Sequence, residues 1–272
     1  MGSLYLIGTG IRLTGQLTLE ARNVLRGADV AFALAGDSLA LAYLRELNPR
    51  IESLEDCYRG GRTRDESYEM MVERLLAPLD DARTVCAAFY GHPGVFVWPS
   101  HEAVRRARQA GHCASMLPGV SSEDCLVADL GVDPGVSGMQ TYEAGDFLVY
   151  RRAFDARVPL VLWQVGALGD RRSTFRLDPK WLQALVAHLI TSYTPEHEVI
   201  VYEAAAFPLD APRVDRVPLR SLLECPLSQV STLYVPPLAA PELDVVHLRA
   251  LGLDETELVE AVWQRHRRAL AS

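Results

Sequence analysis

The chain has 272 residues, of which 49% are hydrophobic and 23% charged, and it carries a net charge of −8. This is the composition of a folded protein with one large domain or two compact ones, and the negative charge argues against a broad nucleic-acid-binding surface. The five cysteines are odd in number and form no C-x-x-C pair, which argues against a disulfide framework or a zinc site and fits a reducing cytoplasm.

Strands and helices alternate through the first half of the chain, as an α/β sheet requires. In chain order, we expect a strand at Leu4–Ile7, a helix at Thr18–Arg26, strands at Asp29–Ala35 and Thr84–Tyr90, a helix at Ser100–Gln109 and a strand at Gly111–Leu117. Thr18 is the expected cap of the first helix.

The second half predicts an α+β or mixed-sheet α/β arrangement. The expected elements are a helix that Ser121 and Asp124 cap and that ends at Gly131, strands near Val158–Val165, Glu198–Ala204 and Ser231–Val235, and a helix opened by Asp178-Pro179 with Leu182, Leu185, Val186 and Leu189 on one face. We place the domains at 1–117 and 118–238, followed by a tail at 239–272. Neither a signal peptide nor a membrane span is present in the sequence, so we expect a cytoplasmic protein.

Two stretches, Phe89–Val97 and Leu117–Cys125, combine apolar residues with glycine turns that expose the backbone. Each follows an expected strand, and we interpret them as two walls of one small-molecule site. A third turn, Gly8-Thr9-Gly10, ends the first strand, but the next glycine is Gly15, so the spacing misses the dinucleotide fingerprint. A tight turn that needs a positive φ explains these glycines equally well, and a classical NAD site is disfavoured.

The order of these motifs resembles that of the tetrapyrrole methylase superfamily, whose members use S-adenosyl-L-methionine. The resemblance is closest to one branch, the borosin-type peptide backbone α-N-methyltransferases, and it extends over most of the chain. The segments that carry it are Leu4–Ile11, Gln16–Thr18, Phe89–Val97, Pro99–His101, Met116–Asp124, Ala128–Pro134, Tyr142–Ala144, Asp146–Leu148, Trp163–Gly166 and Ser231–Pro237. It implies an α/β, class III methyltransferase with two domains and a cofactor cleft between them.

The resemblance also implies a set of residues that bind S-adenosyl-L-methionine and release S-adenosyl-L-homocysteine, with no metal. An apolar slot suits the adenine and thioether, and glycine and proline turns let the main chain approach a ligand. The expected cofactor-binding residues are Gly8, Gly10, Tyr90, His92, Pro93, Gly94, Val95, Phe96, Ser121, Ser122 and Gln164. Three of them have a structural alternative, because His92 could stabilise its turn, Tyr90 could pack between domains and Ser121 could cap its helix.

The polar segment Tyr58–Tyr68 matches the catalytic segment of the family. An amide nitrogen is a far weaker acid than any side chain, so N-methylation needs a proton acceptor and a group that stabilises the carbonyl oxygen as an oxyanion. We expect Arg64 to favour the anionic form of a neighbouring phenol, and Tyr58 and Tyr68 to divide the two roles in either order. Composition alone favours a solvated loop here.

One position departs from the borosin pattern. The family has a further tyrosine three residues before the position of Tyr58, where this chain has Glu55. A carboxylate donates a hydrogen bond only when it is protonated. Glu55 therefore predicts an altered polarisation of the substrate, a second base, or a changed reaction.

Fused borosin enzymes carry their substrate peptide after the catalytic region, whereas this chain stops at Ser272 without a Val/Ile-rich segment. The resemblance therefore implies a split system, in which a separate precursor peptide binds in trans to a homodimer. Residues 254–270 predict an amphipathic helix that serves self-packing or docks a leader peptide. Two rival functions are a tetrapyrrole C-methyltransferase and a catalytically silent cofactor-binding module that docks peptides; neither nucleic acid nor membrane is an expected partner.

Overall fold

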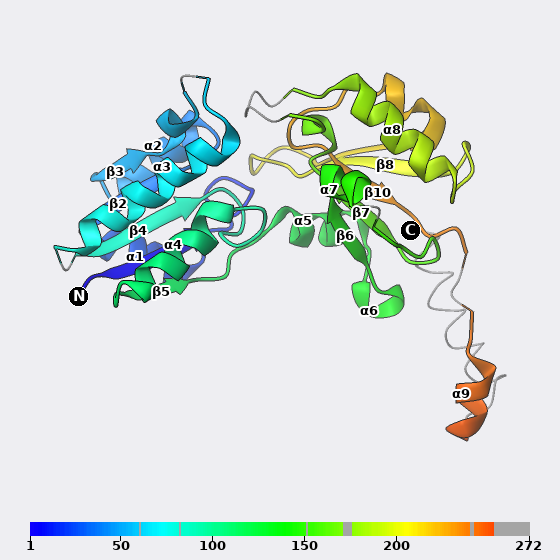
Figure 1. Cartoon of the computed structure of the whole chain (residues 1–272), viewed down its shortest axis with the longest axis horizontal. Coiled ribbons are helices and arrows are strands. Elements are labelled where there is room, and N and C mark those ends of the chain that lie inside the picture. Colours follow the sequence, from blue (N-terminus) through cyan, green and yellow to red (C-terminus); the bar gives the residue numbers. More distant parts are fainter. Residues whose placement is uncertain (60, 82, 151, 171–175, 240–241, 253–272) are drawn as a thin grey trace. The chain divides into compact units, whose positions relative to one another are not determined.

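The computed structural model describes residues 1–252, apart from 60, 82, 151, 171–175 and 240–241 (Figure 1). These residues form two compact units. The first unit contains residues 1–125 and, later in the chain, residues 204–211. The second unit contains most of the remaining chain, from residue 126 onward. The division falls within helix α5 (Ser122–Leu130), a few residues after position 118, and no shift in composition marks the return at 204–211.

The first unit is built on a five-stranded sheet in which every strand pairing is parallel. The strand order is β3-β2-β4-β1-β5. The strands are β1 (Ser3–Gly8), β2 (Val30–Leu34), β3 (Ile51–Ser53), β4 (Thr84–Phe89) and β5 (Cys113–Met116). Because β1 and β4 are central and buried on both faces, they are almost wholly apolar, as buried parallel strands are.

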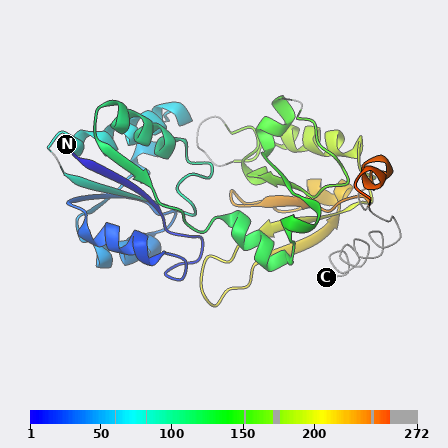
Figure 2. The same cartoon turned by 90° about the horizontal axis from the view of Figure 1, so that it is seen from below.

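Helices cover both faces of this sheet (Figure 2). Helices α1 (Leu19–Gly27) and α2 (Ser38–Leu47) pack on one face, and α3 (Arg64–Leu76) and α4 (Trp98–Gln109) pack on the other. Strand β1 shows the alternation, since Leu6 belongs to the core under α3 and α4 and Ile7 to the core under α1 and α2. The short 3-10 helices η1 (Glu55–Tyr58) and η2 (Ala77–Leu79) flank α3.

Side-chain caps define where these helices begin. The Thr18 hydroxyl accepts a hydrogen bond from the Ala21 backbone, which confirms the predicted cap of α1. A complete capping box, in which Thr63 and Glu66 bond each other's backbone N–H, opens α3. Helix α4 needs no such cap, because a proline occupies its first turn.

The second unit is a mixed five-stranded sheet of order β6-β7-β10-β8-β9. The strands are β6 (Gln140–Glu143), β7 (Leu160–Trp163), β8 (Glu198–Glu203), β9 (Arg213–Pro218) and β10 (Thr232–Val235). Strands β6 and β7 pair in parallel and the other pairs are antiparallel. The remaining elements are α6 (Pro134–Ser137), α7 (Ala144–Val149), η3 (Val165–Ala167), α8 (Pro179–Ile190), η4 (Leu219–Glu224) and α9 (Val245–Ala250). The mixed sheet is one of the two arrangements that the sequence predicts.

Helix α8 supplies the main helical contribution to the core of the second unit. Its four predicted apolar positions, Leu182, Leu185, Val186 and Leu189, are all buried against the sheet. This confirms the predicted face of the helix, which follows from the spacing of apolar residues on a 3.6-residue turn.

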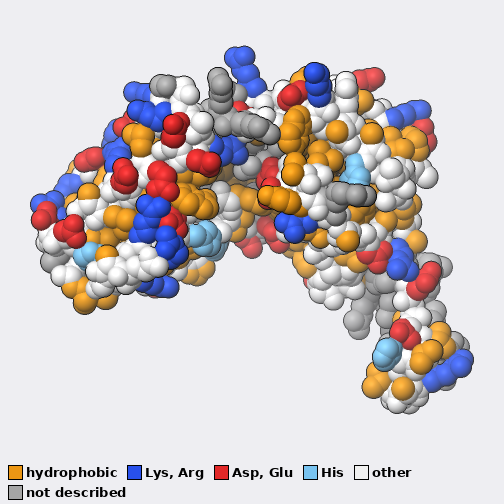
Figure 3. All heavy atoms as spheres, viewed as in Figure 1, with side chains coloured by type: hydrophobic (Ala, Val, Ile, Leu, Met, Phe, Trp, Pro, Cys, Tyr) orange, Lys and Arg blue, Asp and Glu red, His pale blue; other side chains and the backbone are white. Residues whose placement is uncertain are grey.

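Several elements have no counterpart in the sequence prediction, among them α2, β3, β6 and β9. These three strands all lie at sheet edges, where they are short or half-exposed and so lack a run of apolar residues. The predicted C-terminal amphipathic helix at 254–270 lies outside the described residues. No helix among the described residues is long and apolar enough to span a membrane. On the face of the first unit drawn in Figure 3, acidic and basic side chains are interspersed rather than separated by sign.

Candidate functional site

The first unit has a topological switch point between β1 and β4. These neighbouring parallel strands end at the same edge of the sheet, but β1 leads to α1 on one face and β4 leads to α4 on the other. Connections that leave in opposite directions open a crevice at the carboxyl ends of the strands, which is where ligands bind in open α/β sheets. The predicted glycine turns follow these two strands.

Three glycine turns contact one another at this switch point. Gly10 N–H donates to the Gly91 carbonyl at 3.2 Å, and Gly91 N–H donates to the Gly10 carbonyl at 3.0 Å. A Cβ added to Gly8 would lie 2.3 Å from the Gly91 oxygen, and one added to Gly119 would lie 3.1 Å from the Gly8 Cα. Only glycine permits this approach. The structure therefore brings together Gly8, Gly10 and the two predicted walls.

Two aromatic rings are exposed along the turn that follows β4. Tyr90 is 38% exposed and Phe96 is 46% exposed. Phe96 also has a φ of 56°, an uncommon conformation for an aromatic residue. Partial burial, and then the nearby Cys125 and Asp37, raise the pKa of Tyr90 to about 12, so its phenol is neutral at physiological pH. An exposed and strained turn of this kind is typical of a ligand-binding loop.

His92 stabilises the turn on which it lies. Its Nδ1 accepts a hydrogen bond from Gly94 N–H at 2.9 Å, and His101 Nε2 lies 2.9 Å from the Gly94 carbonyl oxygen. A Cβ on Gly94 would lie 2.7 Å from the sulfur of Met116, so the turn is also packed against β5. The structural alternative for His92 is therefore observed, while its contact with a cofactor stays a prediction, as do those of Pro93 and Val95.

Ser121 caps α5 as predicted. Its hydroxyl donates to Asp124 Oδ2 at 2.7 Å, and Asp124 N–H donates back to the Ser121 oxygen at 3.3 Å. The Ser121 backbone N–H also bonds to Asp124. The neighbouring Ser122 is half-buried at the first position of the helix. These serines come directly after Gly119, and so they lie on the third turn of the switch point.

A pocket that is open to solvent adjoins the switch point within the first unit. It is lined by Thr9, Gly10, Ile11, Arg12, Leu13, Thr14, Leu17, Ala35, Asp37, Ala40, Tyr43, Leu44, Tyr90 and Ala206. Of the predicted cofactor residues, Gly10 and Tyr90 line this pocket. Arg12 Nε is buried and has no hydrogen-bond partner among the described residues. The sequence prediction missed Arg12, whose place two residues after the Gly8–Gly10 turn is the available signal.

The three predicted catalytic residues lie together beside the other face of the sheet. The rings of Tyr58 and Tyr68 meet edge to face, with centroids 6.4 Å apart. Arg64 is close enough that its charge lowers the pKa of both phenols. Burial is the larger effect, so the pKa of Tyr58 and that of Tyr68 are both raised above the ordinary value. Composition alone favours a solvated loop at this segment, whereas the structure shows a half-buried aromatic cluster.

The hydrogen bond between the two phenols distinguishes them. It raises the pKa of Tyr58 and lowers that of Tyr68. Tyr68 is the phenol whose anion receives the additional stabilisation.

Ion pairs fix the relative positions of the helices that carry this cluster. Arg74 on α3 binds Asp56 at 2.7 Å and Glu52 at 3.1 Å, which ties η1 and the end of β3 to α3. Arg106 on α4 binds Glu69 on α3 at 2.8 Å. Tyr58 therefore comes from η1, and Arg64 and Tyr68 come from the first turns of α3.

Trp98 lies between the glycine turn after β4 and the phenol cluster, and the sequence prediction missed it. Its ring stacks on Tyr68, with centroids 6.1 Å apart and an interplanar angle of 18°. Trp98 is the first residue of α4, two residues after Phe96, so it connects the turn after β4 to the phenol cluster. An aromatic residue directly after the glycine turn is the signal that could have revealed it.

Glu55 lies on η1 and its side chain is exposed. Its backbone N–H donates to the Ser53 hydroxyl at 3.2 Å. Water screens the charge of an exposed carboxylate, even though Glu55 lies three residues before Tyr58 on the same short helix. Its effect on the reaction stays a prediction.

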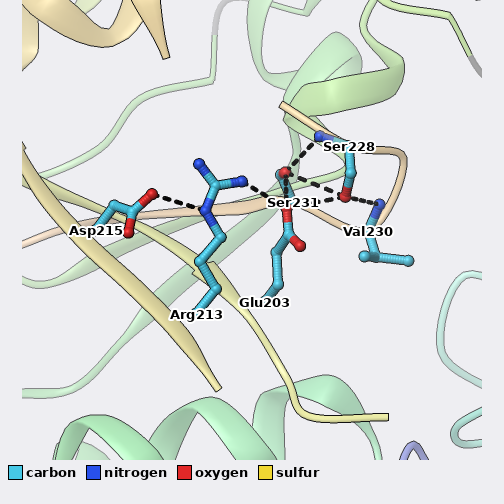
Figure 4. Close-up of polar contacts among 6 residues, drawn as sticks. All are labelled: Glu203, Arg213, Asp215, Ser228, Val230 and Ser231. Carbon is cyan, nitrogen blue, oxygen red and sulfur yellow. Dashed lines mark hydrogen bonds and ion pairs between the residues drawn. The ribbon is translucent and has the colours of Figure 1, made fainter. Parts of the chain in front are cut away.

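Gln164 lies in the second unit, between β7 and η3, with a φ of 60°. The turn after it packs against the loop before β10, since a Cβ on Gly166 would lie 1.8 Å from the Ser228 oxygen. Glu203 holds that loop by accepting from both Ser228 Oγ at 2.9 Å and Ser231 Oγ at 2.5 Å (Figure 4). Arg213 completes the network, and these hydrogen bonds lower the pKa of Glu203 against the opposing effect of burial.

Comparison with known protein families identifies the fold and its chemistry. The model of the Tetrapyrrole (Corrin/Porphyrin) Methylases matches residues 3–222. The chain belongs to the tetrapyrrole methylase family. Its predicted α/β fold of tetrapyrrole-methylase type and its prediction as a methyltransferase are confirmed.

Curated relatives of this tetrapyrrole methylase are borosin-type proteins, which confirms the predicted branch. The chain is 39% identical over 255 residues to the methyltransferase and cyclic peptide dendrothelin A precursor of Dendrothele bispora, a match that covers 92% of this chain and 61% of the relative. It is 38% identical over 265 residues to a methyltransferase and type I borosin precursor of Coprinopsis marcescibilis, covering 94% and 68%. The chain thus spans about two thirds of the length of these relatives.

Solved structures of other tetrapyrrole methylases share the fold. The uroporphyrin-III-C-methyltransferase of Thermus thermophilus matches with a TM-score of 0.62 and 23% identity, covering 93% of this chain and 97% of the other. A cobalt precorrin-4 methyltransferase from cobalamin biosynthesis matches with a TM-score of 0.60 and 16% identity, covering 86% and 94%. At these identities the likeness establishes the fold alone.

Proposed function

We propose that this tetrapyrrole methylase uses S-adenosyl-L-methionine to methylate backbone amide nitrogens of a ribosomal precursor peptide. The observation that carries the proposal is the cluster of Tyr58, Arg64 and Tyr68 beside the glycine turns of the switch point. A pair of phenols with a guanidinium suits proton removal from a very weak acid. The curated relatives, which are named as methyltransferases joined to cyclic peptide precursors, support the choice of substrate.

The residues of the first unit fit S-adenosyl-L-methionine. When bound, this cofactor supplies a methyl group on a sulfonium, and its product S-adenosyl-L-homocysteine is a neutral thioether. The glycine turns leave the backbone accessible, and the exposed rings of Tyr90 and Phe96 offer apolar surface. The buried Arg12 Nε, which lacks a partner among the described residues, suits a carboxylate, as in the amino-acid end of the cofactor.

Tyr68 acts as the proton acceptor. The guanidinium of Arg64 and the hydrogen bond with Tyr58 both stabilise the Tyr68 anion. In this phenolate form, the Tyr68 oxygen takes the amide proton and becomes a neutral phenol as the nitrogen takes the methyl group.

Tyr58 stabilises the substrate carbonyl oxygen. Its ring meets that of Tyr68 edge to face, and a neutral phenol at this place can donate a hydrogen bond to an oxyanion. Its raised pKa keeps the phenol protonated, as a donor must be.

The precursor peptide and the oligomer are also part of the proposal. A separate peptide supplied in trans to a homodimer is the arrangement we favour, and the same residues would act on a peptide joined to the chain. Because Glu55 is exposed to solvent, we propose that it leaves the reaction type unchanged.

Tandem mass spectrometry tests the proposal. The chain is co-expressed with a candidate precursor peptide, and a uroporphyrinogen-type tetrapyrrole is incubated in parallel with the purified protein and S-adenosyl-L-methionine. Methyl groups on the peptide backbone support the proposal. A methylated macrocycle with an unmodified peptide would assign the chain to tetrapyrrole methylation, and cofactor binding with neither product would make it a silent module.

A further inference from the structure

Trp98 covers one face of the Tyr68 ring. The two rings stack at 6.1 Å with an angle of 18°, while Tyr58 meets Tyr68 edge-on from η1. Tyr68 is therefore held between two aromatic rings that come from different elements. Its own helix, α3, supplies neither of them.

The position of Trp98 is itself fixed by the fold. It is the first residue of α4, and α4 is tied to α3 by the ion pair between Arg106 and Glu69 at 2.8 Å. The next residue, Pro99, is buried in the first turn of the helix. Because both helices pack into one core, a ring at the start of α4 has a defined place beside a ring on the second turn of α3.

Trp98 is 44% exposed in spite of this stacking. An indole that only filled a core would be buried, and an indole with no structural role would not stack on a half-buried phenol. One face of the indole contacts Tyr68 and can exclude water from the phenol. The rest of the indole is exposed, so a substrate can still reach the site.

We propose that Trp98 is a positioning residue for the methyl transfer, which holds the Tyr68 ring in place and shields its phenol from water. This inference rests on the proposed function of Tyr68 as proton acceptor. The effect on the rate comes from alignment, because a rigid ring keeps the phenolic oxygen in line with the amide, and the exclusion of water is detected separately through the pKa of Tyr68.

The charges near Tyr68 do not explain its raised pKa without such a shield. Arg64 and Asp65 on α3 have opposite effects on this pKa, and the hydrogen bond with Tyr58 lowers it, yet burial outweighs the sum of these effects. From α4, the first turn contributes no acidic residue. Removing the indole should therefore lower the pKa of Tyr68, because water then stabilises the anion.

The test compares Trp98→Ala and Trp98→Phe with the unchanged protein. Tyr150→Ala serves as the control, since Tyr150 is also exposed but lies in the second unit. For the peptide substrate, Trp98→Ala should lower kcat about tenfold to about 100-fold with little change in KM, and Trp98→Phe should retain most of the activity. Tyr150→Ala should leave both constants unchanged.

The pKa of Tyr68 is followed separately by fluorine NMR of protein labelled with 3-fluorotyrosine, whose phenol titrates at lower pH than that of tyrosine. The Tyr68 signal is assigned by its loss in Tyr68→Phe. Its titration should move to lower pH in Trp98→Ala and return toward the original pH in Trp98→Phe. The Tyr90 signal serves as the internal reference, because general unfolding would shift both.

Three results would overturn the inference. They are unchanged kcat in Trp98→Ala, a rise in KM alone, and an unmoved titration of Tyr68. A rise in KM alone would instead make Trp98 a substrate contact. Failure of the proposed function is distinguishable, because the unchanged protein would then methylate no peptide, while the titration of Tyr68 would still report on the shield.

Discussion

At the scale of single residues, the molecule separates two phenols that the sequence presents as equivalent. Tyr58 and Tyr68 share Arg64, but the hydrogen bond between them favours the anion of Tyr68 only. A base and an oxyanion donor need opposite protonation states, and we propose that this asymmetry divides the two roles. No spacing rule contains that information, because it depends on how the two rings and Arg64 lie in the fold.

Tyr68→Phe should abolish peptide methylation and keep the affinity for S-adenosyl-L-methionine. The phenyl ring preserves the stacking on Trp98, and only the proton acceptor is lost. We expect kcat to fall about 10²- to 10⁴-fold. Peptide mass spectrometry and isothermal titration calorimetry measure the two quantities, and a Tyr68→Phe protein of normal activity would exclude this residue as the base.

Arg64→Met should raise the pKa of Tyr68, since the positive charge that favours the phenolate is removed. The fraction of phenolate at a given pH then falls, and kcat falls with it across the rising limb of the pH profile. Arg64→Lys keeps the charge and is the matched control. A rate that increases in Arg64→Met, or that responds equally to both changes, would contradict an electrostatic role.

Arg12→Gln should weaken the binding of S-adenosyl-L-methionine, because it removes the positive charge and the buried Nε donor from the lining of the pocket. A tenfold loss of affinity corresponds to about 1.4 kcal/mol. Calorimetry with the intact cofactor, compared with an analogue that lacks the carboxylate, checks the assignment. Equal loss for both ligands would show that Arg12 acts on the shape of the pocket and not on the carboxylate.

At the scale of elements, the site depends on the close approach of loops as much as on any side chain. The turns after β1, β4 and β5 touch through Gly8, Gly91 and Gly119. Each turn follows a strand of one parallel sheet, so the order of the strands decides which turns meet.

Gly8→Ala should destabilise the first unit by about 1–3 kcal/mol, since the new Cβ would stand 2.3 Å from a backbone oxygen that cannot move alone. Gly27→Ala at the end of α1 is the control, because a Cβ there meets nothing within 4 Å. Urea unfolding of both variants gives the comparison. If the two substitutions cost the same, the packing of the turns has been overestimated.

Strongly patterned elements were predictable from the sequence. Helix α8 has its apolar residues on one face, and β1 and β4 are nearly continuous apolar runs. Thr18 marks the start of α1 as its N-cap. Edge strand β3 was missed, since three residues with one buried side chain give no period. The glycine turns and the phenols of the site were predicted from the sequence. Trp98 and Arg12 were not, because their places in the site depend on neighbours that are distant in sequence.

At the scale of the whole molecule, several buried tyrosines couple stability to alkaline pH. Burial raises the pKa of Tyr193 and of Tyr234 to about 12. In the unfolded chain the same phenols titrate near about 10. Between these values the folded state binds more protons, so the free energy of unfolding falls as pH rises, by about 1.4 kcal/mol per pH unit for each such group.

Tyr193→Phe should therefore reduce the loss of stability above pH about 10. The Tyr193 hydroxyl is buried without a hydrogen-bond partner among the described residues, so its removal should also leave the protein as stable as before, or more stable, at neutral pH. Chemical unfolding at neutral and alkaline pH measures both effects. A variant with the original alkaline slope would show that other groups control this transition.

The return of residues 204–211 to the first unit has a consequence for how the chain can be divided. Ala206 accepts a hydrogen bond from Leu13 N–H at 2.8 Å and lines the pocket beside Gly10. A fragment that stopped at residue 125 would contain every strand of its sheet and yet lack one wall of the cavity. About eighty further residues must be synthesised before Ala206 can take its place in the pocket. The pocket of the first half of the chain is therefore complete only late in synthesis, and a gene split between the two sheets would place Ala206 on a different product from the other residues that line it.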